Sequence, residues 1–344
     1  MQIKDKELFD LITASIDDDK DLLLKLTPRY TPEDIVALAK ATGRRILVAL
    51  PGPFYKTRLS QDVLYTLTPA SYAETDGIPV TFTDIRRLNA DGTAEFLKER
   101  GYSALFLPFA ECASVYEYGY RASYESIGYM RACAGRFQIT ALCAGLSDGK
   151  QILNTLGITD CVAMRANETL TVDAVKLSTE NGRDDRLVAE VKKTPFVKTA
   201  VVCLTRRHAE NAYRAMEKRG VKAALLHGGR TPEQNADAAN AFEHDDVNVL
   251  VMTKHGLPSA PFLPAEKAIV CGLPVSEAHA RRIASLCPEE KLTCFYTDED
   301  VQLVEKLLPG AKDAMEIAAA DYVSRRTEAF LRPRRLLRPG WSFP

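Results

Sequence analysis

The sequence predicts an α/β fold made of two parallel-sheet lobes. Short apolar runs alternate with amphipathic helical stretches along the chain, which is the pattern of a parallel sheet covered by helices. At 344 residues the chain is long enough for two domains that each bury a core. The composition changes near residues 165–195, and a second series of strands and helices follows. We therefore expect the boundary between the lobes there.

The individual elements follow from apolar runs of strand length and from helical periodicity. In the first half, strands are expected at 45–50, 103–107 and 137–142, with helices at 32–42, 93–100, 124–135 and 151–156. In the second half, strands are expected at 198–204, 223–226, 247–252 and 267–271, with helices at 181–193, 209–219, 232–243 and 301–307. The resulting segments are a helical extension (1–24), a first lobe (25–165), a linker (166–195), a second lobe (196–310) and a C-terminal helix with an Arg-rich tail (311–344).

Composition and charge exclude several classes of protein. The chain is 46% hydrophobic and 26% charged, as is usual for globular proteins. Its longest apolar runs are too short to span a bilayer, and the acidic N-terminus lacks the pattern of a leader peptide. We therefore expect a cytoplasmic protein with no membrane partner. The net charge of −1 excludes binding of nucleic acid by bulk charge, so any such binding needs a local basic patch.

The eight cysteines do not predict a metal site. No two of them are spaced as CxxC, and several lie inside apolar strand-like runs. Buried free thiols behave as small hydrophobic groups. Cys287 and Cys294 would supply half of a zinc site, but no second pair follows them. No metal is expected.

The second half contains several sequence blocks in a distinctive order. A strand-like run over 199–204 leads to Thr205-Arg206, and a later apolar run leads to His227-Gly228-Gly229. Further blocks cover 242–253, 267–282 and 291–308. Together these blocks resemble the second lobe of RecQ-type superfamily 2 helicases, in which they lie at the motifs that close the lobe.

Blocks in the first half resemble the first lobe of the same family. They cover 43–57, 104–124, 139–145 and 151–158, and the whole resemblance extends over residues 29–325. It implies two RecA-like lobes of the P-loop NTPase and helicase type, which face each other across a cleft. A C-terminal helix and a basic tail are expected to follow.

The segment in the place of the P-loop departs from the family pattern. Lys56 and Thr57 stand where the resemblance places contacts to the phosphates and Mg²⁺. A phosphate cradle needs glycines, because backbone N–H groups must approach the phosphates closely. Here Pro53 removes one N–H donor, while Phe54 and Tyr55 add bulk. Lys56 and Thr57 are therefore candidates for a remnant nucleotide site, and the alternative is a plain strand-to-helix turn.

The other ATPase motifs are also altered. The resemblance aligns D-E-A-H with residues 108–111, which read Pro-Phe-Ala-Glu, so both essential acids are absent. Without them neither Mg²⁺ nor the attacking water is positioned. The arginines of the last motif align with Ile283 and Leu286, and Arg281 and Arg282 are expected to point elsewhere. We expect no catalytic residue and no cofactor, with ATP and Mg²⁺ bound only where residual activity persists.

Candidate nucleic-acid contacts lie in both lobes. The resemblance places single-strand contacts in the aromatic-rich loop of the first lobe, where stacking of a base on a ring contributes about 1–3 kcal/mol. In the second lobe it places contacts to the phosphate backbone. The candidates are Tyr116, Tyr118, Tyr120, Arg121, Arg206, His227 and Thr253, to which the C-terminal basic run adds Arg334 and Arg335. The alternatives are tyrosines packed between the lobes and a solvated arginine tail.

These observations support one leading hypothesis and two rivals. The first is a catalytically degenerate RecQ-like protein that acts as a scaffold on single-stranded or branched DNA, with protein partners, in replication, repair or mobile-element biology. The second is a divergent ATP-dependent helicase or translocase that a partner subunit completes. The third is a protein-interaction module without nucleic-acid binding, which the near-neutral charge favours.

Overall fold

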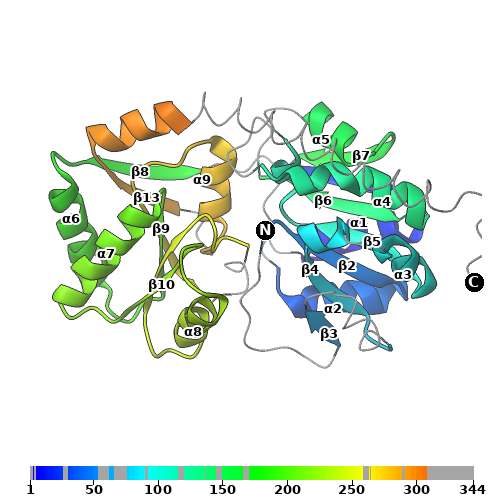
Figure 1. Cartoon of the computed structure of the whole chain (residues 1–344), viewed down its shortest axis with the longest axis horizontal. Helices are drawn as coiled ribbons and strands as arrows, with labels where there is room; N and C mark the ends of the chain where they lie inside the picture. The colour runs from blue at the N-terminus through cyan, green and yellow to red at the C-terminus, as the bar shows by residue number, and fades with distance from the viewer. Residues whose placement is uncertain are drawn as a thin grey trace, which may run out of the picture.

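The chain folds into two lobes that lie side by side (Figure 1). The computed structural model describes residues 3, 5–25, 30–52, 62–65, 76–89, 92–114, 120–135, 137–144, 149–165, 170–258, 263, 265–288 and 291–307. Each lobe contains one sheet in which every pair of neighbouring strands is parallel. The predicted α/β fold class with two parallel-sheet lobes is confirmed.

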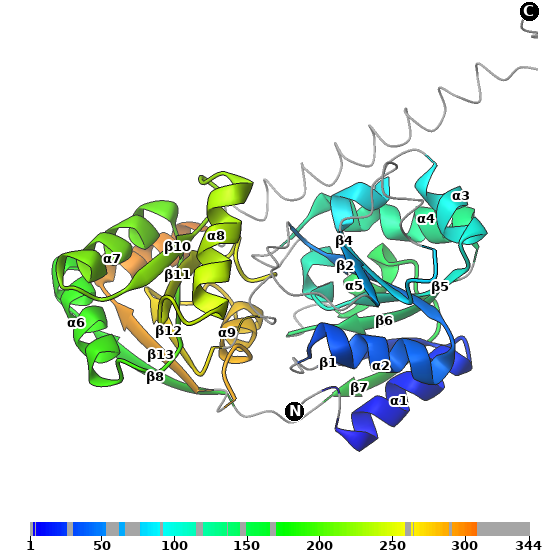
Figure 2. The ribbon, with the colours of Figure 1, turned by 90° about the horizontal axis from the view of Figure 1, so that it is seen from below.

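The first lobe is built on a seven-stranded sheet in the order β3-β4-β2-β5-β6-β1-β7. Its strands are β1 (Asp21–Lys25), β2 (Arg45–Leu50), β3 (Val63–Tyr65), β4 (Val80–Asp84), β5 (Tyr102–Leu107), β6 (Gln138–Leu142) and β7 (Cys161–Arg165). Its helices are α1 (Lys6–Asp17), α2 (Pro32–Thr42), α3 (Thr93–Glu99), α4 (Ile127–Ala134) and α5 (Gly149–Thr155). Figure 2 shows α1 and α2 on one face of the sheet, and α3 and α4 on the other.

The second lobe is built on a six-stranded sheet in the order β10-β11-β9-β12-β13-β8. Its strands are β8 (Thr171–Lys176), β9 (Thr199–Cys203), β10 (Ala223–Leu226), β11 (Val249–Thr253), β12 (Lys267–Cys271) and β13 (Lys291–Tyr296). Its helices are α6 (Glu180–Lys193), α7 (Arg206–Lys218), α8 (Pro232–Glu243) and α9 (Glu277–Ala284). Residues 298–307 are also helical.

Two of the predicted segment boundaries are wrong. Residues 166–195 are not a linker in their whole length, because β8 pairs with β13 over six residues and α6 packs on the second sheet. Residues 1–24 are not a separate extension, because β1 lies between β6 and β7. Helix α1 buries Leu8, Ile12 and Ile16 in the core of the first lobe. The predicted C-terminal helix and Arg-rich tail (311–344) lie outside the described residues.

Alternating side chains of the second sheet enter two different cores. Val201, Val251 and Ile269 pack under α6 and α7, while their chain neighbours point to the face covered by α8 and α9. Buried apolar contacts run without a break from that second face into the core of the first lobe. None of the described helices has the length and apolar character that a crossing of a bilayer requires.

Short 3₁₀ turns carry the chain away from the strands of the first lobe. They are η2 (Ile85–Asn89) after β4, η3 (Ala110–Ala113) after β5 and η4 (Ala122–Ser126) before α4. The segments that follow β2, β5 and β6 therefore lie at the carboxyl edge of one sheet. In open α/β sheets this edge is where ligands bind.

Candidate functional site at the lobe boundary

Segments from both lobes line a small pocket at this carboxyl edge. The residues that the structure describes enclose a volume of about 50 Å³ in this pocket. It is lined by Pro51, Phe109, Glu111, Cys112, Arg121, Lys254, Leu257, Pro258, Ser276, Ala278, His279 and Arg282. Small-molecule sites usually enclose about 300–1,000 Å³. The described lining therefore encloses a space of the size that water fills.

A buried ion pair between Glu111 and Arg282 crosses the lobe boundary in this pocket. Glu111 lies in η3 of the first lobe, and Arg282 lies on α9 of the second. The Nε and Nη2 atoms of Arg282 each donate a hydrogen bond to a different carboxylate oxygen at 2.9 Å. The two side chains are only 8% and 5% exposed. This two-bond geometry between a guanidinium and a carboxylate is among the strongest that proteins use.

Further contacts hold the same pair in place. The amide N–H of Ala144, which follows β6, donates to Glu111 Oε2 at 3.3 Å. The guanidinium carbon of Arg282 lies 4.2 Å from the centre of the Phe109 ring, at cation–π distance. Burial opposes the charge of Arg282, but Glu111 and Tyr30 outweigh it, so the pKa of Arg282 lies above its usual value. The guanidinium of Arg282 therefore keeps its charge although it is buried.

The prediction that Arg282 points away from the first lobe is wrong. Helix α9 begins after Ser276, whose hydroxyl accepts a hydrogen bond from the N–H of His279. With this start, Arg282 lies three residues after His279 on the buried face of the helix. Arg281 is the outward residue, and it pairs with Glu277 one turn earlier.

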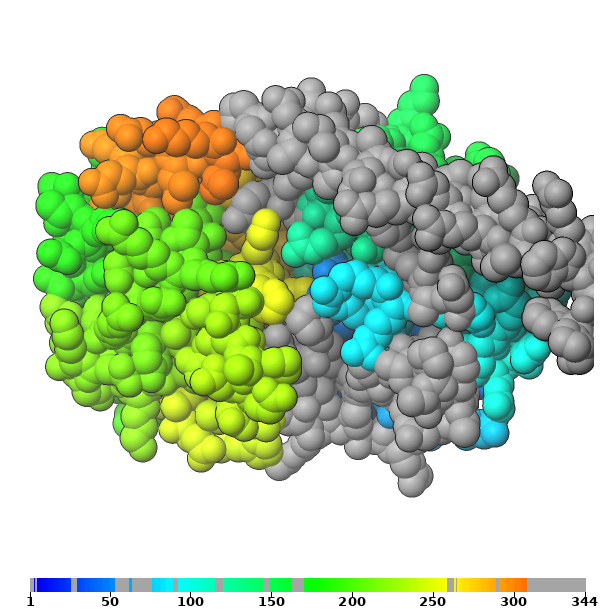
Figure 3. Space-filling model, viewed as in Figure 1, coloured from blue at the N-terminus to red at the C-terminus, as the bar shows by residue number. Residues whose placement is uncertain are grey.

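Four cationic side chains from both lobes lie around the pocket and the ring of His255, and we call them the cleft cations. They are Arg86, which pairs with Asp84, and Arg121 of the first lobe, and Arg206 and Lys254 of the second. Burial lowers the pKa of His255, and the charges of Arg121, Arg86 and Arg206 lower it further. Burial and Arg121 together lower the pKa of Lys254 to about 8. Charges on both lobes therefore act on the same place, where Figure 3 shows the yellow surface of the second lobe facing the cyan surface of the first.

Two predicted nucleic-acid contacts, Arg121 and Arg206, belong to this group. Arg206 is exposed at the first position of α7, and Thr205 caps that helix by accepting from the N–H of His208 at 3.1 Å. The Nε atom of Arg121 donates to the carbonyl oxygen of Pro51 at 3.2 Å. The structure therefore brings together one residue from each lobe that the sequence singled out.

The glycines of the predicted His227-Gly228-Gly229 motif permit a close approach to His255 and to Arg206. A Cβ atom on Gly228 would lie 3.2 Å from the ring of His255, and one on Gly229 would lie 3.3 Å from Cδ of Arg206. His227 itself is 4% exposed, and its Nδ1 accepts from the N–H of Gly229 at 3.0 Å. Its side chain therefore shapes the loop and does not face solvent, which corrects the predicted phosphate contact.

Two more of the predicted site residues are buried, and the remaining ones lie outside the described residues. Thr253 is 6% exposed at the end of β11, and Tyr120 is 5% exposed, so its ring offers no open face to a base. The predicted roles of these two side chains are corrected accordingly. Tyr116, Tyr118, Lys56, Thr57, Arg334 and Arg335 lie outside the described residues.

The sequence interpretation missed Arg86, Lys254 and His255. Lys254 and His255 directly follow β11, and Arg86 follows β4 by two residues. Each lies at the carboxyl end of a parallel strand, where binding residues are common. The strand at 247–252 was predicted, so its carboxyl end could have pointed to Lys254 and His255. Strand β4 was not predicted, so no such indication existed for Arg86.

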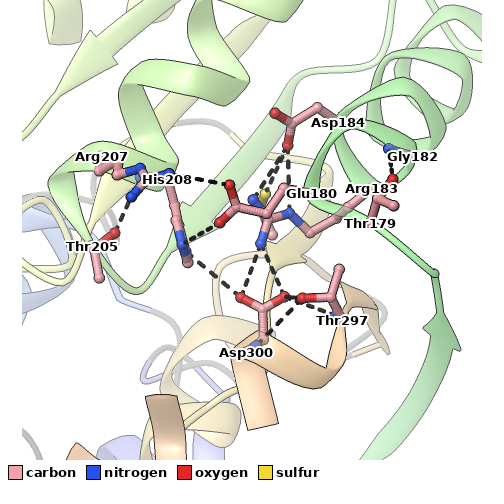
Figure 4. Close-up of polar contacts among 11 residues, drawn as sticks. Thr179, Glu180, Gly182, Arg183, Asp184, Thr205, Arg207, His208, Thr297 and Asp300 are labelled. Atoms are coloured by element: carbon pink, nitrogen blue, oxygen red, sulfur yellow. Dashed lines mark hydrogen bonds and ion pairs between the residues drawn. The ribbon is translucent and has the colours of Figure 1, made fainter. Parts of the chain in front are cut away.

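A second buried polar cluster lies within the second lobe (Figure 4). Arg183 of α6 donates from Nη1 to both carboxylate oxygens of Asp300 at 2.9 Å, and both side chains are fully buried. His208 of α7 lies 3.6 Å from Asp300 and 3.3 Å from Glu180. Burial lowers the pKa of His208 and Arg183 lowers it further, so its ring is neutral. The cluster joins α6, α7 and the helix after β13.

Comparison with known protein families finds a match to part of the second lobe. Residues 182–256 match the helicase conserved C-terminal domain. The chain is 24% identical over 165 residues to the ATP-dependent DNA helicase Q-like 4B of Arabidopsis thaliana. That match covers 46% of this chain and 14% of the relative, so the chain corresponds to a small part of the longer protein.

Solved structures share the fold of both lobes. The DEAD-box helicase Mss116 bound to ssRNA and UDP-BeF has a TM-score of 0.65 at 12% identity, covering 85% of this chain and 70% of that one. The Mycobacterium smegmatis helicase Lhr bound to ssDNA and AMP-PNP has a TM-score of 0.63 at 13% identity, covering 87% and 47%. The chain therefore has the fold of these helicase structures, two RecA-like lobes side by side, and part of its second lobe matches the helicase conserved C-terminal domain.

Proposed function

We propose that this helicase-fold protein is a nucleic-acid-binding scaffold that works without hydrolysing ATP. Single-stranded DNA would lie across both lobes and contact the cleft cations through its phosphates. The observation that carries the proposal is the gathering of basic side chains from both lobes at one boundary, in a chain whose net charge is −1. Such contacts position a strand without reading its sequence.

The similarity to known helicases supports the choice of ligand. The curated relative is named a DNA helicase, and solved neighbours are bound to ssRNA or ssDNA. The RecQ-like similarity supports a role in DNA replication, repair or mobile-element biology. Partner proteins would then bring a chemical activity to the strand that this chain holds.

The state of the ATPase positions supports the absence of hydrolysis. By the resemblance, Pro108 and Phe109 stand where two acids would hold Mg²⁺ and activate water, and Glu111 is engaged by Arg282. Phosphoryl transfer depends almost entirely on such positioning and charge stabilisation. The damage to several parts of one machine makes repair by a single compensating change implausible.

A salt titration of binding to a fluorescent single-stranded oligonucleotide tests the proposal. The logarithm of the affinity should fall linearly with the logarithm of salt concentration, because each phosphate contact releases counterions. Arg206→Ala should weaken binding at low salt and reduce the steepness of this line by about 0.7. The measurement is fluorescence anisotropy over a range of salt concentrations.

Arg214→Ala is the matched control. Arg214 is on the same helix as Arg206, is 65% exposed and pairs with Glu210 one turn earlier. Its removal subtracts the same charge from the whole protein but not from the lobe boundary, so the slope should stay unchanged. Absence of binding by the unmodified protein at low salt would contradict the proposal and favour a docking platform for proteins.

A further inference from the structure

The pocket at the lobe boundary has the position of a ligand site but holds a side chain of the protein itself. It lies at the carboxyl edge of the first sheet, next to Pro51 and Gly52 at the start of the altered P-loop segment. Arg282 enters this pocket from the opposite lobe and meets Glu111 there. A guanidinium recognises phosphate and carboxylate with the same two-bond geometry. Glu111 therefore supplies the type of anion that a phosphate ligand would supply.

The carboxylate of Glu111 connects three separate segments of the chain. It is carried by η3 after β5, it accepts from the N–H of Ala144 after β6, and it accepts two hydrogen bonds from α9. Phe109 covers one face of the guanidinium. The two bonds from Arg282 and its contact with Phe109 need the lobes to be close together, whereas the bond from Ala144 lies within the first lobe and fixes the carboxylate there.

We propose that Glu111 replaces a nucleotide phosphate, so that an internal ion pair with Arg282 holds the two lobes closed. Closure then requires no ligand. A ligand shifts a conformational equilibrium only through its different affinities for the two states. Because the anion position is already filled, ATP gains no additional contact from closure and does not drive it.

This arrangement has a direct consequence for binding, which rests on the proposed function. Arg121 belongs to the first lobe, and Arg206 and Lys254 belong to the second. Closure places these cleft cations beside one another, as the effect of Arg121 on the pKa of Lys254 indicates. The surface that holds the nucleic acid is therefore permanently assembled, and affinity for the strand is independent of nucleotide.

Small-angle X-ray scattering of the full chain tests the ion pair without nucleic acid. The unmodified protein should have the same radius of gyration with and without AMP-PNP and Mg²⁺. Glu111→Gln keeps the shape of the side chain but leaves the guanidinium of Arg282 buried without its counter-charge, which should outweigh the apolar contacts at the boundary, separate the lobes and increase the radius. Hydrogen exchange in residues 105–111 should also become faster, because the carboxyl edge of β5 gains access to water.

Two further variants make the result specific to the ion pair. Arg214→Ala removes a 65% exposed guanidinium that pairs with Glu210 on α7, so its radius should match that of the unmodified protein. The combined Glu111→Arg and Arg282→Glu exchange should restore the compact radius that Glu111→Gln loses. Circular dichroism establishes that each variant retains its helices.

Each outcome bears on the proposal by itself. A radius that shrinks when AMP-PNP is added to the unmodified protein overturns it, as does a Glu111→Gln variant that stays compact with unchanged exchange. In the binding arm, an oligonucleotide should bind the open variant roughly tenfold or more weakly, because only a minor closed population is competent. Loss of oligonucleotide binding with an intact scattering result would refute the proposed function alone.

Discussion

Two buried arginine–carboxylate pairs in this chain have the same chemistry but connect different parts of the molecule. Arg183 and Asp300 join α6 to the helix after β13 inside one lobe, whereas Arg282 and Glu111 join one lobe to the other. The first pair is surrounded by Thr297, His208 and further acids, and it has no exposed surface. The second pair borders a pocket.

The difference lies in what happens when each pair breaks. Separation of the lobes would return Glu111 and Arg282 to water, where both regain hydration, and it would also expose the apolar contacts that join the cores of the two lobes. No comparable movement hydrates Arg183, because its helix is packed on the sheet by Leu187 and Val191. The first pair therefore connects elements of one lobe, and the second connects the two lobes.

The largest effect on stability is expected from Asp300→Asn. The change leaves the guanidinium of Arg183 buried without its full counter-charge, which costs about 3–5 kcal/mol of the free energy of unfolding. The matched control is Asp298→Asn, two residues earlier, where a 73% exposed carboxylate pairs with Lys176. That exposed pair contributes about 0–1 kcal/mol. Urea unfolding followed by circular dichroism measures both, and equal effects of the two changes would refute the distinction.

Part of this architecture was predictable from local sequence, because interior strands of a parallel sheet are apolar on both faces. The expected strands at 45–50, 223–226 and 267–271 have the same bounds as β2, β10 and β12. The edge strand β8 was missed, because most of its residues are exposed and its sequence TVDAVK lacks an apolar run. Strand β1 was absorbed into the acidic helical segment before it.

The candidate site was less predictable, because it depends on contacts between lobes. Whether Arg282 or Arg281 faces the first lobe depends on the start of α9 at Ser276 and on how the lobes dock. Tyr120 illustrates a second limit, since an aromatic residue beside arginine has the same local sequence whether it stacks on a base or packs in a core. Its burial follows from tertiary packing alone.

A smaller effect, on binding and not on folding, is expected from the titration of Lys254. Its pKa of about 8 means that the free protein carries this charge at pH 7 and has mostly lost it at pH 9. The charged form binds phosphate, so affinity for single-stranded DNA should fall as the pH rises through this range. The steepness of the salt dependence should be smaller by about 0.7 at pH 9 than at pH 7.

The variant Lys254→Arg separates this effect from other titrations at the boundary. Arginine stays charged throughout this range, so the variant should bind with a slope that is the same at both pH values. His279 and Cys112 also line the pocket, but their pKa values of about 3 and about 12 keep them neutral between pH 7 and pH 9. If the affinity for single-stranded DNA falls with pH equally in the unmodified protein and in Lys254→Arg, Lys254 is not the titrating group.

The smallest expected effect is none at all, and it concerns Lys56. In a working P-loop enzyme this lysine contacts the transferred phosphates, so its removal abolishes turnover. Here we expect no measurable ATP hydrolysis by the full chain, with or without single-stranded DNA. Lys56→Ala should therefore change neither the background rate of phosphate release nor the radius of gyration. The physical reason is that Glu111 already engages Arg282 and the acids that would hold Mg²⁺ are replaced. A phosphate-release assay under excess ATP measures the rate of hydrolysis. Hydrolysis by the unmodified protein that disappears in Lys56→Ala would show that the nucleotide site still functions and that the ion pair opens during a catalytic cycle.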